Sequence, residues 1–230
     1  MLMNRFCAFL LLMLGISTTL HAAELAIPAF TGDGEPSKRL TSLREVRFQN
    51  VVEQKTDYSC GAAALATLLR YAFARPITEN DVIVGMFNGA NAEQVRKQGF
   101  SMLDMKRYVN SLQLRASGFV TGVEKLPALR IPVIIMLDIN GYKHFVVLKL
   151  ATKDSVFIAD PALGNRSLRM DEFKRQWNGV LLAVAGPGYR PNTPLRRIPA
   201  ILSARSAVNS MQPVELAELV EYGFLHSDFF

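Results

Sequence analysis

The pattern of apolar residues changes its period near residue 114, and this change constrains the fold more than any other feature of the chain. Before it, apolar residues recur at helical spacing. After it, they form short runs of β-branched and aromatic residues separated by turn signals. Helices followed by closely connected strands predict an α+β domain in which N-terminal helices pack on an antiparallel sheet. We expect this domain to span residues 46–186.

The first half of the domain is expected to contain helices at residues 60–73, 78–86 and 101–112. Ser59 can cap the first helix, and the other two begin with the spacing of a capping box, a Thr or Ser followed three residues later by Asp. A strand at residues 46–52 is expected before them. Residues 88–99 are expected to form a polar loop.

The second half is expected to contain strands at residues 114–120, 133–138, 144–150, 155–160 and 180–185, a helical turn at 123–129 and a short helix at 171–177. Asn140-Gly141 is a hairpin signal between two of these strands. Residues 151–154 can turn between the next two. These short connections favour antiparallel pairing of consecutive strands.

The first 23 residues have the organisation of a secretory signal peptide. Arg5 precedes an apolar stretch that is too short for a comfortable membrane span, and Ala22-Ala23 offers small residues for cleavage. Cys7 precedes the apolar stretch, which excludes it as a lipid-attachment cysteine at a cleavage site. We therefore expect a periplasmic protein, with a retained inner-membrane anchor as the alternative.

The segments outside the expected domain have a different composition. Residues 24–45 are rich in Gly, Pro, Ser and Thr and are expected to be extended. Residues 187–230 are expected to form a C-terminal arm, in which Pro213 opens an amphipathic helix. This helix either docks on the domain or meets a partner.

Charge, motif content and the length of apolar runs argue against several classes of function. The formal net charge is +6, or +5 without Arg5, and the basic residues are scattered, so we expect no nucleic-acid partner. The sequence contains no phosphate-binding loop and no run of eighteen apolar residues, which argues against an ATPase or a membrane pump. We also expect no metal and no cofactor.

Cys60 is the only cysteine after the apolar leader. A lone thiol cannot form an intrachain disulfide, and in an oxidising compartment it persists where it is buried or used. The first turn of a helix stabilises a thiolate through its unpaired amides and its dipole, so Cys60 is a candidate nucleophile. A small buried hydrophobe is the alternative. Gly61 is expected to let a substrate chain approach the thiol closely.

Two histidines follow the leader, and only one of them lies in an apolar strand. His226 is expected to be solvated. His144 opens a strand, and Asp160 closes the next one sixteen residues later. If the turn is centred near Thr152, the register places residues 144 and 160 opposite each other, where the carboxylate can fix the imidazole tautomer. A structural histidine and a turn-initiating Asp before Pro161 are the alternatives.

Gln54 precedes the cysteine by six residues. Its amide can donate a hydrogen bond to the oxyanion that forms when a thiolate attacks a carbonyl, together with the N–H at the helix start. The chain order Gln, Cys, His, Asp therefore supplies a nucleophile, a base and a group that orients the base.

These motifs resemble those of the C39 peptidases, papain-like cysteine proteases that remove double-glycine leaders from exported peptides. The resemblance covers residues 46–186 and rests on Gln, five residues, Cys-Gly-Ala-Ala-Ala-Leu, then His-Phe-Val-Val-Leu and Asp-Pro-Ala. It implies a papain-like fold with Cys60 as nucleophile, His144 as general base and acid, Asp160 as the orienting group and Gln54 as the oxyanion donor.

The sequence departs from the familiar members of that family in two ways. Most of those members are N-terminal domains of ATP-driven transporters, whereas we expect this chain to have an export signal and no transporter. Ser59 stands where Asp is common. Free-standing exported proteins of this type are similar to a component of the functional-amyloid secretion systems of Gram-negative bacteria.

The expected function is a periplasmic cysteine peptidase that cleaves an extended segment of an exported protein. The resemblance implies cleavage after a pair of small residues such as Gly-Gly, and secretion-system components as further partners. A non-catalytic module that binds a leader or an unfolded client is the alternative. A thiol redox protein is disfavoured because no second cysteine forms a C-x-x-C pair.

Overall fold

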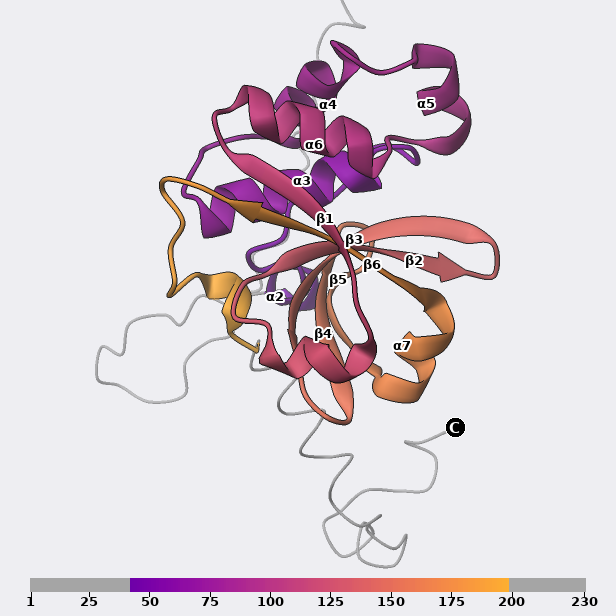
Figure 1. The fold of residues 1–230 in the computed structure, drawn as a ribbon, viewed down its shortest axis with the longest axis vertical. Helices are drawn as coiled ribbons and strands as arrows, with labels where there is room; N and C mark the ends of the chain where they lie inside the picture. Colours follow the sequence, from indigo (N-terminus) through magenta and orange to yellow (C-terminus); the bar gives the residue numbers. More distant parts are fainter. Residues whose placement is uncertain (1–41, 199–230) are drawn as a thin grey trace, which may run out of the picture. The chain divides into compact units, whose positions relative to one another are not determined.

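The computed structural model describes residues 42–198 (Figure 1). The expected signal peptide, the extended segment up to residue 41, the helix opened by Pro213 and the site of His226 lie outside these residues. None of the helices between residues 42 and 198 is long and apolar enough to cross a membrane.

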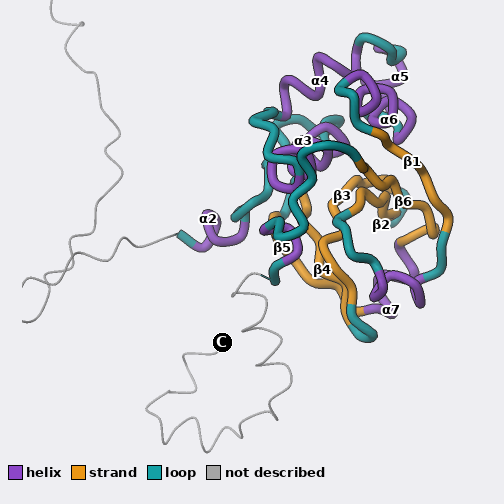
Figure 2. The backbone as a smooth tube through the Cα atoms, turned by 60° about the vertical axis from the view of Figure 1, so that its left-hand side comes forward, coloured by secondary structure: helices purple, strands orange, loops and turns teal. Residues whose placement is uncertain are grey.

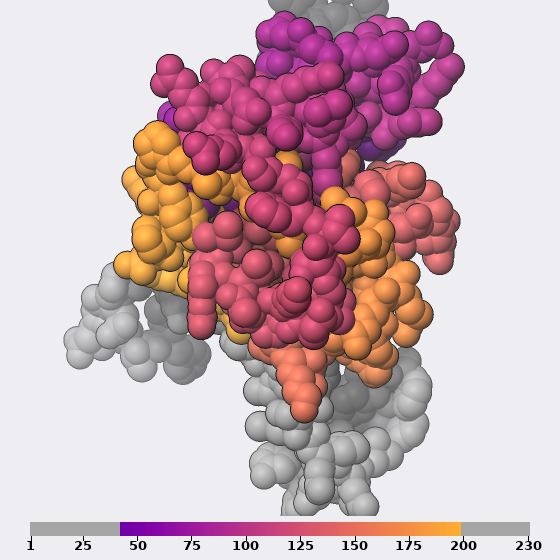
Figure 3. Space-filling model, viewed as in Figure 1, coloured from indigo at the N-terminus to yellow at the C-terminus, as the bar shows by residue number. Residues whose placement is uncertain are grey.

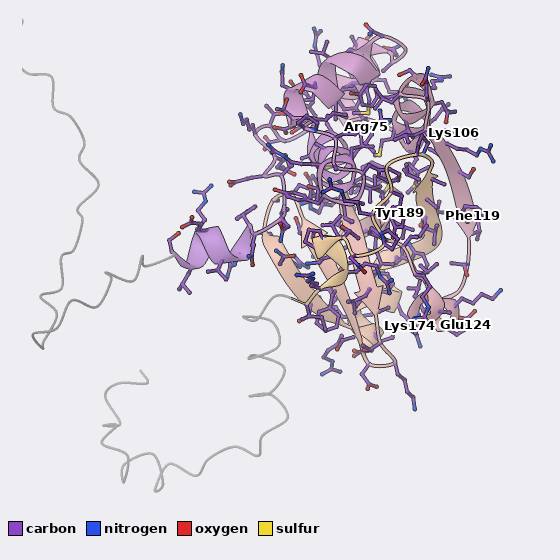
Figure 4. The ribbon with its side chains drawn as sticks, turned by 90° about the vertical axis from the view of Figure 1, so that its left-hand side faces the viewer. Arg75, Lys106, Phe119, Glu124, Lys174 and Tyr189 are labelled. Carbon is purple, nitrogen blue, oxygen red and sulfur yellow. The ribbon has the colours of Figure 1, made fainter. Side chains whose placement is uncertain are left out.

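One antiparallel sheet organises the described residues. Its strand order is β1-β6-β2-β3-β4-β5. The strands are β1 (Arg115–Val120), β2 (Val133–Ile139), β3 (Tyr142–Ala151), β4 (Ser155–Asp160), β5 (Gly164–Arg169) and β6 (Trp177–Ala185). Phe119 on the edge strand β1 is half exposed at the outside of the domain (Figure 4). The expected α+β class is confirmed.

Helices cover both faces of this sheet. They are α2 (Leu43–Arg47), α3 (Cys60–Ala72), α4 (Glu79–Phe87), α5 (Ala92–Gln98), α6 (Met102–Ser111), α7 (Met170–Gln176) and the 3₁₀ helices η1 (Val123–Ala128) and η2 (Pro194–Arg196). Helices α3 to α6 gather on one side, and α7 lies at the other end of the sheet (Figures 1 and 2). The described residues therefore form three layers: helices α3 to α6, the sheet, and a smaller layer made by η1 and α7 on the other face of the sheet.

The alternation of side chains along β3 divides the core into two clusters. Phe145 and Val147 face the cluster shared with α3, α4 and α6, whereas Val146 and Leu148 face the cluster shared with η1 and α7. A sheet that is covered on both faces buries both sides of its central strands, so β3 is buried from His144 to Lys149 and its middle, Phe145 to Leu148, is an apolar run.

Helix α3 lies at the centre of the larger hydrophobic cluster, and its small residues let neighbouring elements pack closely against it. Eleven of its thirteen residues are buried, as expected of a helix that is apolar on all sides. A Cβ atom at Gly61 would come within 2.7 Å of the Met105 Cε atom and 3.2 Å of the Phe145 Cδ2 atom. Gly61 therefore lets α6 and β3 pack closely against α3.

Local sequence signals fix several element boundaries as expected. The capping boxes at Thr78 and Ser101 are both present, and each hydroxyl accepts a hydrogen bond from an Asp backbone N–H three residues later at 3.2 Å. Asn140 and Gly141 both have positive φ, 54° and 88°, which is the conformation of a two-residue type I′ hairpin turn.

Three expectations about elements are wrong. The strand expected at residues 46–52 is replaced by helix α2 and a turn, because Ser42 accepts a hydrogen bond from the Glu45 backbone N–H and starts a helix. The loop expected at residues 88–99 contains α5, which Asn91 caps. Strand β5 was not expected, and it pairs with β4 through a hairpin that begins at Asp160-Pro161.

Residues 187–198 extend the packed domain beyond residue 186. The Arg190 backbone N–H donates to the Ala72 carbonyl at 2.8 Å, and the Thr193 hydroxyl donates to the Tyr71 carbonyl at 2.9 Å. Leu195 is fully buried. This part of the expected C-terminal arm is therefore docked on the end of α3.

Candidate active site

Cys60 is the first residue of α3, and the residue is only 6% exposed. Ser59 occupies the N-cap position, but its hydroxyl makes no capping bond and instead donates to the Thr56 carbonyl at 2.7 Å. The first amides of α3 therefore receive no side-chain cap from Ser59. Such amides favour a negative charge at the helix start, where the thiol lies.

His144 and Asp160 form a buried pair. The His144 Nε2 atom lies 2.7 Å from the Asp160 Oδ1 atom, and the two residues are 3% and 0% exposed. The same oxygen accepts hydrogen bonds from the backbone N–H groups of Ala162 and Leu163 at 2.9 and 3.2 Å. The turn after β4 therefore fixes the carboxylate, and the carboxylate fixes the imidazole.

The pair forms through a register that differs from the expected one. Val147 lies opposite Ala159, so residues 144 and 160 are diagonal neighbours and not direct partners. The turn is centred on Lys153-Asp154 instead of Thr152, which shifts the pairing of β3 with β4 from the expected register. The bulge at Lys149 reduces this shift by one residue. The expected contact is present because the two positions still share a face of the sheet.

Electrostatic effects of opposite sign act on His144. Burial lowers the pKa of its imidazole, but the hydrogen bond that the ring donates to Asp160 and then the interaction with Cys60 outweigh burial and raise the pKa to about 9. Burial raises the pKa of the Asp160 carboxyl, yet the hydrogen bond from His144 holds it below its ordinary value. An imidazolium beside a carboxylate is therefore the favoured charge state at neutral pH.

The second ring nitrogen of His144 remains available for chemistry. Its Nδ1 atom is buried and has no aligned hydrogen-bond partner within residues 42–198. Because Cys60 contributes to the raised pKa of this ring, the thiol lies within its electrostatic reach. The thiol, the ring and the carboxylate are thus brought together in chain order Cys, His, Asp.

Gln54 is positioned by its backbone beside the end of β4. Its backbone N–H donates to the Pro161 carbonyl at 2.9 Å, next to Asp160. Its Nε2 atom makes only a long 3.5 Å contact with the Thr56 carbonyl, and its buried Oε1 atom has no partner in the described part of the chain. The amide is therefore loosely held, and its role as oxyanion donor stays a prediction.

A groove of about 1160 Å³ opens beside the thiol. Cys60 lines it together with the β2–β3 hairpin on one side and residues of α5 and α6 on the other. The surface is hollowed between the magenta helices and the salmon-coloured hairpin (Figure 3). An open groove of this volume can hold an extended peptide.

Tyr142 connects this groove with the imidazole. Its ring stacks on that of His144 with centroids 6.0 Å apart, and its hydroxyl donates to the Asp57 carbonyl at 3.4 Å. Burial, and then the charge of Cys60, raise the pKa of the Tyr142 phenol. Tyr142 therefore forms a neutral wall between the solvent and His144.

Three features of the site were not found from the sequence. Tyr142 lies two residues before His144 on the same strand, and this period-2 spacing was an available signal. Arg166, whose Nη1 atom lies 3.4 Å from the Asp160 Oδ2 atom, is on β5, and the β4–β5 hairpin was signalled by Asp160-Pro161 at the start of a turn. Helix α5, which lines the groove, was signalled by Asn91 as an N-cap.

The structure places Gly61 in the core and not among the groove-lining residues. Its neighbours are Met105 and Phe145, as described above. Its expected contact with substrate therefore stays a prediction, whereas its packing role is visible. Within residues 42–198, no group of three or more His, Cys, Asp or Glu side chains is arranged to hold a metal ion.

A helical cluster packed on an antiparallel sheet, with a thiol at a helix start beside a buried His–Asp pair, defines a papain-like cysteine peptidase fold. The chain belongs to the peptidase C39 family, whose model matches residues 49–187. The expected family and fold are confirmed.

Two relatives match almost the whole chain. A protein of Pseudomonas aeruginosa named probable functional amyloid protease FapD is 49% identical, and the match covers 95% of this chain and 97% of the relative. A protein of the same name from Pseudomonas fluorescens is 48% identical, with 97% and 99% covered.

Solved structures agree with this fold. The double glycine motif protease from an AMS/PCAT transporter, in complex with the leader peptide, is 30% identical with a TM-score of 0.50 and covers 58% of this chain and 89% of that chain. The peptidase domain of Streptococcus ComA is 18% identical with a TM-score of 0.51, covers 59% and 96% of the two chains, and supports the fold alone.

Proposed function

We propose that this protein is an exported cysteine peptidase that acts in the periplasm on an extended segment of another exported protein. The observation that carries the proposal is the buried 2.7 Å contact between His144 and Asp160, beside a thiol that starts a helix and opens on a groove. A nucleophile, a base and a group that orients the base are the elements of covalent catalysis.

The proposed reaction begins with the Cys60 thiolate and the His144 imidazolium. The thiolate attacks the peptide carbonyl, and the resulting oxyanion accepts hydrogen bonds from the Cys60 backbone N–H and from the Gln54 amide. The imidazolium gives its proton to the leaving amine. The ring then takes a proton from the water that releases the acyl group from Cys60. Asp160 keeps the ring oriented throughout.

The proposed substrate is an unfolded segment with two small residues before the cleaved bond. Two properties of relatives support this choice. The 30% identical structure is named a double glycine motif protease and holds a leader peptide. The relatives from Pseudomonas are named functional amyloid proteases, which supports a client that belongs to an amyloid secretion system.

A peptide library tests the proposal. Cleavage after Gly-Gly, Gly-Ala or a similar pair is expected, and the Cys60→Ala protein serves as the blank. Bulky residues before the bond should be excluded, because a side chain that meets a closed wall costs more than a missing methylene does. Preferred cleavage after Leu, Phe or Arg would refute this specificity.

Two further results would separate the proposal from its alternative. Tight binding of a peptide in the groove without cleavage of any peptide would indicate a non-catalytic binding module. In cells, the N-termini of co-exported proteins should differ between strains with and without this chain if it is a peptidase.

A further inference from the structure

We propose that Arg166 is a positioning residue of this site, which holds the second oxygen of Asp160 and balances the charge of the Cys60, His144 and Asp160 side chains. This inference rests on the proposed function, because it takes Cys60 as a thiolate nucleophile. Arg166 is not among the residues that line the groove, and its ion pair is with Asp160, so its action would pass through the carboxylate.

The sheet places Arg166 on the same face as the His–Asp pair. Asp160 lies opposite Gly164 on β5, so Arg166, two residues further, is its diagonal neighbour on that face. His144 is the diagonal neighbour from β3 on the other side. One face of the sheet therefore carries His144, Asp160 and Arg166 side by side across three adjacent strands.

The two oxygens of Asp160 have different surroundings. Oδ1 accepts three hydrogen bonds, from His144 and from two backbone amides. Oδ2 is buried without an aligned hydrogen bond among the described residues, and the Arg166 Nη1 atom lies 3.4 Å from it. Because the Arg166 side chain is only 24% exposed, this ion pair is poorly screened by solvent.

Counting charges shows what Arg166 adds. The titratable and charged groups around the His–Asp pair are Cys60 from α3, Tyr142 and His144 from β3, and Arg166 from β5. Asp57 also acts on Tyr142, but it is exposed to solvent and outside the buried cluster. With a neutral Tyr142, a thiolate, an imidazolium and a carboxylate sum to one negative charge. A buried uncompensated charge is costly, and the guanidinium removes it. Arg166 therefore favours the charge state in which the thiol is reactive.

The rate of Cys60 alkylation by iodoacetamide, measured against pH, reports this charge state without requiring peptidase activity. Mass spectrometry of the Cys60 peptide separates its signal from that of Cys7. The variants are Arg166→Gln, Arg166→Lys and, as the matched control, Arg169→Gln. Arg169 is exposed, pairs with Asp171 and lies at the other end of β5.

We expect Arg166→Gln to move the midpoint of the alkylation profile upward by about one pH unit, because a nearby cation no longer stabilises the thiolate and the carboxylate. Arg166→Lys should keep a midpoint close to that of the wild type, and Arg169→Gln should not change it. Urea unfolding checks that each variant is folded. An unchanged midpoint in folded Arg166→Gln, or an equal shift in Arg169→Gln, would overturn the inference.

A second measurement does not depend on the thiol. In the Cys60→Ala protein, the His144 ring can be titrated by NMR with Arg or Gln at position 166. Loss of a balancing cation should raise the His144 midpoint by about half a unit, whereas a displaced carboxylate would lower it. An unchanged midpoint contradicts the inference, and a lower midpoint would show that Arg166 acts mainly by holding the carboxylate in place. If wild-type Cys60 reacts only in the ordinary thiol range of about 8.5, the proposed function fails and this titration still tests Arg166.

Discussion

At the scale of single residues, the buried pair of His144 and Asp160 depends on each member being held by the other. Asp160 is fixed by two backbone amides as well as by the ring. His144 has the carboxylate on its Nε2 atom, and Cys60 interacts with the same ring. The three side chains should therefore act as one unit, and their removal should not be additive.

Replacing Cys60 or His144 by Ala is expected to lower kcat by at least about 10³-fold, because the loss of either removes the nucleophilic step. Asp160→Asn should be milder, since it disturbs the orientation of the ring without deleting the proton acceptor. Hydrolysis of the preferred library peptide measures the loss, and circular dichroism checks the fold. Turnover near the wild-type value in either Ala variant is incompatible with the proposed enzyme.

Gln54→Ala should lower kcat by roughly 10²-fold with little change in KM, because an oxyanion donor acts mainly in the transition state. Gln176→Ala is the matched control, since Gln176 on α7 also has a buried amide oxygen without a partner among residues 42–198. A rise in KM alone would instead identify Gln54 as a substrate-binding residue.

The pH dependence of activity should follow His144. Its pKa is raised from 6.5 to about 9, so the imidazolium persists through neutral pH and is lost as the pH rises through about 9. The stabilisation of the folded state by the imidazolium and Asp160 is complete below pH 6.5 and is lost as the pH rises from 6.5 through about 9. The alkaline limb of kcat/KM is therefore expected near pH 9, and Asp160→Asn should move it to lower pH. An alkaline limb that Asp160→Asn leaves in place would assign it to another group.

At the scale of secondary-structure elements, strand β3 contains a buried lysine. Lys149 lies in the bulge of β3 and is 3% exposed, and its ammonium donates to the Asn165 Oδ1 atom at 2.7 Å. The Asn165 amide donates in turn to the carbonyls of Arg47 and Gln49. This network ties the chain before Gln54 to β5, and burial lowers the pKa of Lys149 to about 8.

Lys149→Met should change the pH dependence of stability. Between pH 8 and 10.5 the unfolded wild-type chain binds more protons than the folded one, so its free energy of unfolding should rise with pH over this interval. Relative to the variant, we expect a gain of roughly 1–3 kcal/mol. Urea unfolding at several pH values measures it, and the contribution of His144 cancels in the difference. Parallel curves for the two proteins would show that Lys149 does not titrate in this interval.

Elements with local signals were predictable from the sequence. Capping boxes at Thr78 and Ser101 and the Asn140-Gly141 turn depend on neighbouring residues alone, and all three are present. The residue types of the site were predictable from chemistry, because nucleophilic catalysis requires a nucleophile, a base and a group that orients the base.

Features set by tertiary contacts were not predictable in the same way. The register of β3 and β4 depends on the bulge at Lys149, which is stabilised by Asn165 and, through Asn165, by the carbonyls of Arg47 and Gln49 more than a hundred residues before Asn165 in the sequence. Strand β5 is polar along much of its length, so its apolar pattern is weak. Arg166 was missed because its partner, Asp160, becomes a neighbour only when that strand is paired.

At the scale of the whole molecule, the packed domain extends past the region that the family model matches. A chain that ends at Gly186 should have a free energy of unfolding about 2–4 kcal/mol lower than one that ends at Ile198, because it loses the burial of Leu195 and two hydrogen bonds to the end of α3. Urea unfolding of the two truncated chains compares them directly. Equal midpoints would mean that residues 187–198 add nothing to stability.

The placement of His144, Asp160 and Arg166 on three neighbouring strands has a consequence for refolding experiments. A slip of one residue in either strand pairing would turn one of these side chains to the opposite face of the sheet. Molecules that regain helices and strands with a slipped pairing would therefore have an inert thiol, although their circular dichroism would look native. The fraction of Cys60 that reacts rapidly at neutral pH then counts correctly paired molecules, and the yield of native protein can be followed without knowing its client.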